Sequence, residues 1–551
     1  MMANKSKPLA LEEIRDSARE MLASGEVDEA LDYLLSALDS VLEKNRSLEL
    51  LLAKLRRQQV GKKSERIDPR QLSLLFEELA RQSDLETENS VDPEVETKAD
   101  AELASQIEAA RKDELAAPES KKRKKNKREV KTRNVERIEH HRTVPEDQRL
   151  CESCGKAKRR MGTDTSKVLE YVPGHFVEHS YHLEKYACGS CKDGVTTAEG
   201  PAKVLERSVA GSSLLAHIVV SKFADHCPLH RQRRIFRRDG TLLAVSTMSD
   251  WVAGVADRVQ PIVDRLAERI LSAHVVGTDA TGLNVLDPKS PGNIKRGTIW
   301  CYTGDGRDVL LRYAPTGEGA TGPWEFLADR SGYIQADGAN IFDRLFNGEV
   351  ASAVELGCWS HGRRRLEAMK DTDCRVAYPL RLIARLYRIE TLGDARRLDP
   401  DGRAALRKER SVEVLDKLKR WLVATAVNEN PGSSMAKACG YLLNQWDALG
   451  RFVEDGRLSP DNNLVERQLR DVALGRKNFL FAGSDDAAHR AATLYSLMRT
   501  CSQHGVPNLR YLDDVLTKLA HGWPDDRLEE LLPDRWWKLH AEPLLELVAE
   551  N

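Results

Sequence analysis

Several features are missing from this chain of 551 residues, and each absence excludes a class of protein. No apolar run approaches the length that crosses a bilayer, and the first residues lack the apolar stretch of a secretory signal. The ten cysteines do not follow a disulfide framework, and the sequence has no internal repeats. A chain of this length is too long for one compact domain, so we expect three or more folded domains. With hydrophobic residues at 41%, we expect a cytoplasmic protein with no membrane partner.

Charge is segregated along the chain, although the net charge is only −1. Residues 84–118 are mainly acidic, whereas residues 121–133 carry nine Lys or Arg and one Glu. Such a basic run is typical of a segment that binds a nucleic-acid backbone, but equally of a solvated and disordered charge run. If the run binds DNA, we expect Lys121, Lys122 and Arg123 to contact phosphates.

A leucine-rich heptad pattern covers residues 27–58. Leucine or valine fills both core positions of four heptads, except at the lone polar residue Asn45. The pattern predicts either a coiled-coil pair whose register the Asn fixes, or an amphipathic helix that packs within its own chain. The first alternative makes the protein a homo-oligomer.

Four of the cysteines form two CxxC pairs, while the other six are scattered. The pairs are Cys151 with Cys154 and Cys188 with Cys191, with 33 residues between them. Two thiolates on each of two tight turns complete a tetrahedral zinc site, and four thiolates leave no open position for catalysis. The residues between the pairs alternate as β-strands do. The sequence therefore predicts a ribbon with structural Zn²⁺, rather than unrelated surface cysteines.

From residue 272 the pattern changes to three strands, a helix, a strand, a helix and a strand, which is the order of an RNase H-like core. Residues 362–455 then have an almost wholly helical pattern. Asp279 in VVGTDATG and Asp337 in GYIQADGAN each follow an apolar run, where we expect a strand to end. Glu466 stands near the start of a helix in SPDNNLVERQLR.

Each of these three acids is ordinary when taken alone. Together, carboxylates that converge from two strands and a helix have the ligand chemistry for two Mg²⁺ ions, or two Mn²⁺ ions. One ion activates a water or a 3′-hydroxyl, and the other stabilises the leaving oxygen of an in-line displacement. Arg467 and Arg470 beside Glu466 supply positive charge that suits a polyanionic substrate.

A series of motifs makes this chain resemble the insertion-sequence-66 family of bacterial transposases. The motifs are GKKSERID, the two CxxC pairs, KFADHCPLHRQRRIFRRDG, GTDATG, ADGAN, CWSHGRRR, DNNLVERQLR and GRKNFLFAGS, in this order. The resemblance implies a DDE-type catalytic triad of Asp279, Asp337 and Glu466. It also implies an RNase H-like fold split by a helical insertion between Asp337 and Glu466, and small accessory transposition proteins as partners.

The motif CWSHGRRR contains a Cys-x-x-His element, Cys358 and His361, similar to one in several families of this kind. Two ligands do not complete a metal site, so we expect a structural or DNA-contacting role rather than half of such a site. His361 as a general base is a weaker alternative, because two-metal chemistry needs none.

Double-stranded DNA, both as terminal repeats of the element and as target, is the expected partner. A basic helix near residue 230 presents a group of arginines for phosphate contacts. These are Arg231, Arg233, Arg234, Arg237 and Arg238. The helix at 246–258 is either the second helix of a helix-turn-helix or a packed helix, because Trp251 and Val252 suit burial equally well.

The chain is thus expected to be a multidomain α/β protein. Its expected parts are a coiled-coil N-terminal region (1–83), a charged linker with the basic run (84–138), a zinc-binding ribbon (139–200), a helical DNA-binding region (201–270), the first part of an RNase H-like core (271–365), an all-helical insertion (366–455), a core helix with Glu466 (456–490) and a C-terminal helical region (491–551).

Three functions remain open at this stage. The first is an active transposase that nicks element ends by hydrolysis and then joins the freed 3′-hydroxyl to target DNA. The second is a metal-dependent nuclease or resolvase on the same core, without strand transfer. The third is a catalytically inert, transposase-derived regulator that binds DNA. The complete triad argues against the third, and the large insertion argues against the second.

Overall fold

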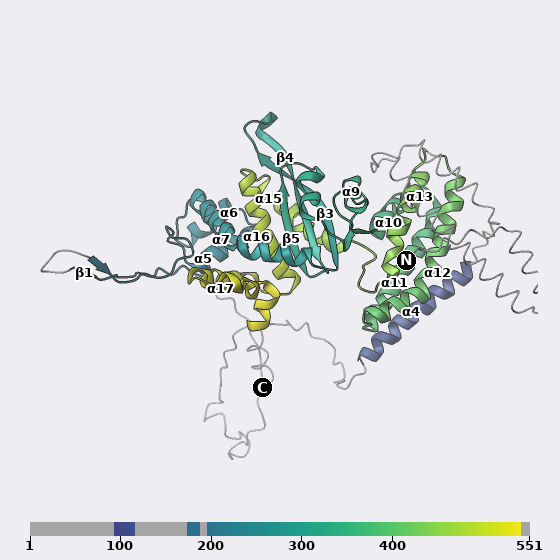
Figure 1. Cartoon of the computed structure of the whole chain (residues 1–551), viewed down its shortest axis with the longest axis horizontal. Helices are drawn as coiled ribbons and strands as arrows, with labels where there is room; N and C mark the ends of the chain where they lie inside the picture. Colours follow the sequence, from purple (N-terminus) through teal and green to yellow (C-terminus); the bar gives the residue numbers. More distant parts are fainter. Residues whose placement is uncertain (1–92, 116–173, 188–194, 431, 541–551) are drawn as a thin grey trace, which may run out of the picture.

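The computed structural model describes residues 93–115, 174–187, 195–430 and 432–540. The expected coiled coil, the basic run and all four CxxC cysteines lie outside these residues. The described residues form two separate hydrophobic cores, one around a five-stranded sheet and one within a group of helices beside it (Figure 1). The protein is therefore a mixed α/β protein with more than one core. Among the described helices, none is both long and apolar enough to span a membrane.

The sheet has the strand order β5-β4-β3-β6-β7. Its strands are β3 (Val275–Leu286), β4 (Ile294–Gly304), β5 (Asp308–Ala314), β6 (Tyr333–Gln335) and β7 (Val354–Leu356). The first three strands form an antiparallel meander, whereas β6 and β7 run parallel to β3. Helix α8 (Pro323–Phe326) precedes β6, and α9 (Asp343–Phe346) precedes β7. The succession of strands and helices is the predicted one.

Helix α16 (Asp485–Gln503) covers the edge of the sheet at β5. The Leu311 N–H donates to Ser496 Oγ at 2.8 Å, and the Val309 N–H donates to Thr500 Oγ1 at 3.1 Å. Hydroxyl groups on a helix thus satisfy strand amides that would otherwise be buried without a partner. This explains why the helix carries buried polar residues on its apolar face.

Three consecutive helices come directly before the sheet in the chain. They are α5 (Ser212–Phe223), α6 (Leu229–Arg238) and α7 (Val245–Leu271). Trp251 and Val252 on α7 are both buried in the core around the sheet. Of the two alternatives for residues 246–258, burial favours the packed helix. Helix α17 (Asn508–Ala520) packs against α5 (Figure 1).

Helix α15 (Asn463–Phe479) packs closely against β3. A Cβ atom at Gly277 would lie 2.8 Å from each of three atoms, Asn462 Oδ1, Thr303 Oγ1 and Val465 Cγ2. No real side chain tolerates such distances in a packed interior. Glycine at this position is therefore what allows the helix to lie this near to the strand.

The second core lies in the helices between β7 and α15. They are α10 (Trp359–Glu367), α11 (Ala377–Ala395), α12 (Pro400–Val427), α13 (Ser434–Asn444) and α14 (Trp446–Gly450). The buried guanidinium of Arg407 joins them, because it donates to three backbone carbonyls and lies 2.7 Å from a carboxylate oxygen of Glu390. A buried charge is tolerated only with such a complete set of partners.

A further helix, α4 (Pro93–Leu115), packs along α11 (Figure 1). Arg385 Nη1 lies 2.6 Å from Glu96 Oε2, with both side chains nearly buried, and Leu103 joins the second core. A packed helix thus stands where the sequence predicts a charged linker over 84–138, and that prediction is wrong for residues 93–115. The acidic side chains of α4 pair with basic side chains far along the chain, as Asp100 does with Arg385, 285 residues later. A local charge pattern does not reveal such pairs.

The described residues near the second CxxC pair also differ from expectation. Strand β1 (Lys185–Ala187) pairs antiparallel with β2 (Val195–Thr197), but residues 174–184 form no strand. Their alternating pattern is not matched by a buried face, since Val177 and Tyr181 are both exposed. A period of two residues predicts a strand only where one face packs against a core.

Candidate active site

The two aspartates stand next to each other on neighbouring strands. Strands β3 and β6 run parallel and pair Gly277 with Gln335. Asp279 comes two residues after Gly277, and Asp337 comes two residues after Gln335. The two aspartates therefore lie at the same level along the sheet. Asp337 lies just beyond the end of β6, as predicted. The predicted strand end at Asp279 is wrong, because β3 continues to Leu286 in an unbroken pairing with β4.

Glu466 occupies the first turn of α15, and its charge acts on Asp279. Burial raises the pKa of Asp279, and the charges of Asp337 and Glu466 raise it further, to about 6. The Ala280 N–H, which donates to Asp279 Oδ1 at 2.7 Å, and the more distant Arg364 act in the opposite direction. Asp337 and Glu466 are thus both within electrostatic range of the partly buried Asp279.

This group of carboxylates fits divalent metal ions. Carboxylate oxygens are the ligands that Mg²⁺ prefers, and neither aspartate forms an ion pair with any residue that the structure describes. Burial first, and then the charges of Asp337 and Glu466, raise the pKa of Asp279 and so disfavour its ionised form. A bound cation would offset these effects.

Among the described residues, Glu466 alone of the three has basic side chains within ion-pair distance, and both belong to α10. Arg364 Nη2 lies 3.2 Å from each carboxylate oxygen, and His361 Nε2 lies 3.6 Å from Glu466 Oε1. The Arg364 side chain is 61% exposed, so it holds the carboxylate from the solvent side. Sequence reasoning missed Arg364, although its spacing of three residues from His361 places both on one helix face.

The start of α10 is bound to the residues just before α15. The Trp359 N–H donates to Pro460 O at 3.0 Å, and the Asn462 N–H donates to Cys358 Sγ at 3.2 Å. Burial raises the pKa of the Cys358 thiol to about 11, so the group stays protonated near neutral pH and is poorly suited to bind a metal. For Cys358 the geometry favours the structural alternative.

The turn after Asp337 is held by the second core. The Ala339 N–H donates to Asp337 Oδ1 at 3.1 Å, and the Tyr441 hydroxyl donates to the backbone carbonyl of Asp337 at 2.8 Å. Gly338 has a φ of +75°, a conformation that glycine adopts without strain. The helices between β7 and α15 thus help to position the second aspartate.

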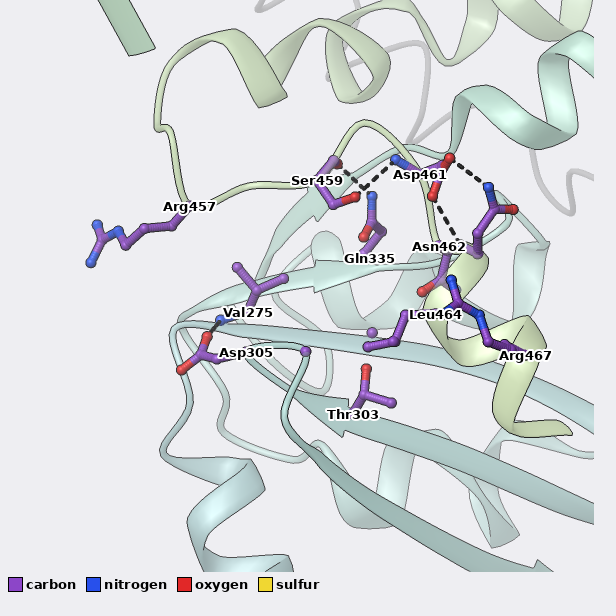
Figure 2. A pocket seen from close by; sticks show the side chains of 13 residues that line it. Val275, Thr303, Asp305, Gln335, Arg457, Ser459, Asp461, Asn462, Leu464 and Arg467 are labelled. Carbon is purple, nitrogen blue, oxygen red and sulfur yellow. Dashed lines mark hydrogen bonds between the residues drawn. The ribbon is translucent and has the colours of Figure 1, made fainter. Parts of the chain in front are cut away.

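A pocket of about 440 Å³ opens on the same part of the sheet (Figure 2). Gly277, Gln335 and Asn462 line it, and they stand two to four positions before the three carboxylates. Figure 2 shows Gln335 reaching the loop before α15, where its Nε2 donates to Ser459 O at 2.8 Å. Asn462 Nδ2 donates to Thr278 O at 2.9 Å. These amides fix the start of α15, and therefore Glu466, over the sheet.

The predicted basic helix is α6, and it meets the end of α15. Arg231 Nη1 donates to Asn478 Oδ1 at 3.1 Å. We define the basic surface as the exposed cationic residues of the two helices. They are Arg231, Arg233, Arg234, Arg237, Arg238, Arg467, Arg470 and Lys477. None of them forms an ion pair with a residue in the described ranges, so the basic surface lacks counter-charges there.

A second group of possible metal ligands lies apart from the three carboxylates. Among the described residues, Asp308, His504 and Asp534 form the one set of three whose donor atoms all lie within 4.8 Å of one another. Arg269 already binds both carboxylates, at 2.5 Å and 2.8 Å. Burial raises the pKa of Asp534, but its bond to Arg269 outweighs this and keeps the pKa below the usual value. We therefore interpret this set as an ion-pair cluster.

Comparisons with known proteins identify the family. Residues 207–490 match the Transposase IS66 family, residues 148–192 match the zinc-finger binding domain of transposase IS66, and residues 496–533 match the IS66 C-terminal element. Uncharacterized protein y4qI of Sinorhizobium fredii (strain NBRC 101917 / NGR234) is 32% identical over 95% of this chain and 94% of its own length. From the same organism, y4hP is 29% identical (91% and 90% covered) and y4jD is 33% identical (71% and 79% covered). The chain belongs to the IS66 family of transposases.

Proposed function

We propose that the protein is an active DDE transposase of a bacterial insertion sequence, with Asp279, Asp337 and Glu466 as its catalytic, metal-binding residues. What supports this proposal is that Asp337, just beyond β6, and Glu466, on α15, both act electrostatically on the partly buried Asp279 of β3. Membership of a transposase family supports it.

The three carboxylates would hold two Mg²⁺ ions, or Mn²⁺ ions, and these ions would supply activation of the attacking oxygen and stabilisation of the leaving oxygen. Within the described part of the chain, Asp279 and Asp337 form no ion pair that would compete with a metal, whereas Glu466 would have to give up its contact with Arg364. In the first reaction a water oxygen bonds to phosphorus and the bond to the 3′ oxygen breaks, which leaves a 3′-hydroxyl at the element end. In the second reaction that 3′ oxygen bonds to a phosphorus of the target, the target's own bond between phosphorus and its 3′ oxygen breaks, and the target strand is left with a free 3′-hydroxyl.

The finer architecture is part of the same proposal. The strand order and the succession of elements support an RNase H-like core, interrupted by a helical insertion over 366–455. The zinc-finger match supports Zn²⁺ binding, for which we propose Cys151, Cys154, Cys188 and Cys191 as the ligands. The heptads at 27–58 are proposed to pair two subunits, since two element ends must be held together. Small accessory proteins remain proposed partners.

Double-stranded DNA is the proposed substrate, and the basic surface is its proposed binding site in the described part of the chain. When Lys and Arg side chains neutralise phosphates, counterions condensed on the DNA are released to solution, and this release favours binding. Lys121, Lys122 and Arg123 are proposed to add phosphate contacts.

The test is a nicking and joining assay on DNA that carries the inverted repeats flanking the gene, together with a target plasmid. In Mg²⁺ or Mn²⁺ we expect nicked ends followed by joined products. Nicking without joining would favour the resolvase alternative, and binding with neither reaction would favour the inert regulator.

A further inference from the structure

The C-terminal end of α15 has an unusual backbone. The helix ends at Phe479, and Leu480 has a φ of +64°, in the left-handed region that a leucine side chain rarely adopts. Strained residues of this kind persist where the surroundings hold them in place, and they are frequent at functional sites. Glycine or asparagine would reverse the chain here with less strain. We therefore expect the leucine side chain itself to have a role.

The strained turn is held firmly on its far side by strand β3. The Ala482 N–H donates to Asn284 O at 2.9 Å, and the Leu286 N–H donates to Ala482 O at 2.9 Å, which forms a bridge between Ala482 and Val285. The chain is thus fixed both before and after Leu480.

The fixed turn exposes two large apolar side chains. Leu480 is 63% exposed and Phe481 is 42% exposed. We call these two residues the apolar tip. Because hydrogen bonds hold the backbone on both sides, the apolar tip is presented in a defined position and does not collapse onto the core.

Cationic side chains precede the apolar tip, whereas Asp485 and Asp486 follow it in the chain. The exposed Lys477 precedes it by three residues, and Asn478 receives a hydrogen bond from Arg231 at the start of the arginine-rich helix α6. Asp485 is paired with Lys295 at 2.6 Å, so its charge is compensated within the protein. An apolar protein partner would find few matching groups here, whereas a polyanion with flat apolar bases matches both the charge and the exposed apolar atoms.

We propose that the apolar tip is a DNA-contacting wedge, which packs against a base that has left the helical stack while the basic surface holds the phosphates. This proposal rests on the proposed function as a DNA-binding enzyme. Helix α15 rises about 1.5 Å per residue, so the tip lies about 20 Å from Glu466. That distance corresponds to about six base pairs between the cleaved bond and the disturbed base step.

The test compares two DNA probes of the same sequence, one fully paired duplex and one with a short unpaired bulge. The variant is Leu480→Asn combined with Phe481→Ser, because asparagine tolerates a positive φ and both side chains become polar. We expect the wild-type protein to bind the bulged probe about tenfold more tightly than the paired one, in line with the stacking of one base. The variant should bind both probes equally, with an unchanged salt dependence, since its phosphate contacts remain.

Leu509→Asn is the matched control, because Leu509 is also exposed, at 46%, but lies on α17 outside the basic surface. It should keep the full preference for the bulged probe.

If the wild type binds DNA without a preference for the bulged probe, or if the tip variant keeps that preference, the wedge proposal is wrong and the proposed function stands. If the variant instead changes the oligomeric state measured by light scattering, the tip is a subunit contact and the proposal is overturned. If the wild type binds neither probe, the proposed function fails as well.

Discussion

Asp279→Asn is expected to lower nicking of element-end DNA about 1,000-fold, with strand transfer lost to the same extent. The substitution removes a charged ligand at the place where two carboxylate-bearing strands meet. Metal assistance is worth several kcal/mol of transition-state stabilisation, and each 1.36 kcal/mol corresponds to a factor of ten in rate. The measurement is the rate of the single-strand nick at saturating Mg²⁺, repeated in Mn²⁺.

Loss of folding is not expected to explain this result. Folding raises the pKa of Asp279 to about 6. At higher pH the carboxylate is ionised in the folded, metal-free protein, and its charge then lowers the stability of the fold. The neutral Asn should therefore leave the melting temperature at pH 8 without metal equal to that of the wild type, or above it. Asp287→Asn, just beyond the end of β3, is the control and should nick at the wild-type rate. If Asp279→Asn nicked DNA at the wild-type rate, Asp279 would not be a catalytic residue.

Gly277→Ala is expected to produce the second large effect, through the position of α15. The added Cβ would meet three atoms at 2.8 Å, among them Asn462 Oδ1 and Val465 Cγ2. Overpacking of this kind costs about 1–3 kcal/mol in the free energy of unfolding. Because Glu466 moves with the helix, nicking should also fall about 100-fold, as a displacement of about 1 Å does in other active sites.

The matched control is Gly282→Ala on the same strand. The three atoms nearest to its Cβ all belong to the side chain of Arg296, which can turn away. We expect little change in the free energy of unfolding or in nicking. If Gly277→Ala were as active and as stable as Gly282→Ala, the close approach of α15 would not position Glu466.

The sequence predicted the parts of this structure that depend on local pattern. The succession of strands and helices over 272–361 is confirmed, because apolar runs of strand length and Gly-rich turns mark these elements. Asp279, Asp337 and Glu466 were found from the strand and helix contexts together with the family motifs. Their catalytic role stays a prediction, as does the role of each DNA-binding residue.

Features that depend on distant partners escaped the sequence. The acids of α4 look like a solvated linker until Arg385 and its neighbours on α11 are brought beside them. Arg364 looks like one basic residue among several, and only the fold places its guanidinium on Glu466. The strain at Leu480 is likewise invisible, since a leucine in a turn gives no sign of its φ.

The central claim is that the three carboxylates bind the catalytic metal ions, and iron-directed cleavage of the protein tests it most directly. Fe²⁺ replaces Mg²⁺ in oxygen-rich sites, and with ascorbate and peroxide it cuts the backbone near the bound ion. We predict fragments that end near Asp279, Asp337 and Glu466, suppressed by excess Mg²⁺ and absent from Asp279→Asn. Mg²⁺-sensitive cleavage near Asp308, His504 and Asp534 instead would contradict the account, because the metal site would then be the cluster around Arg269.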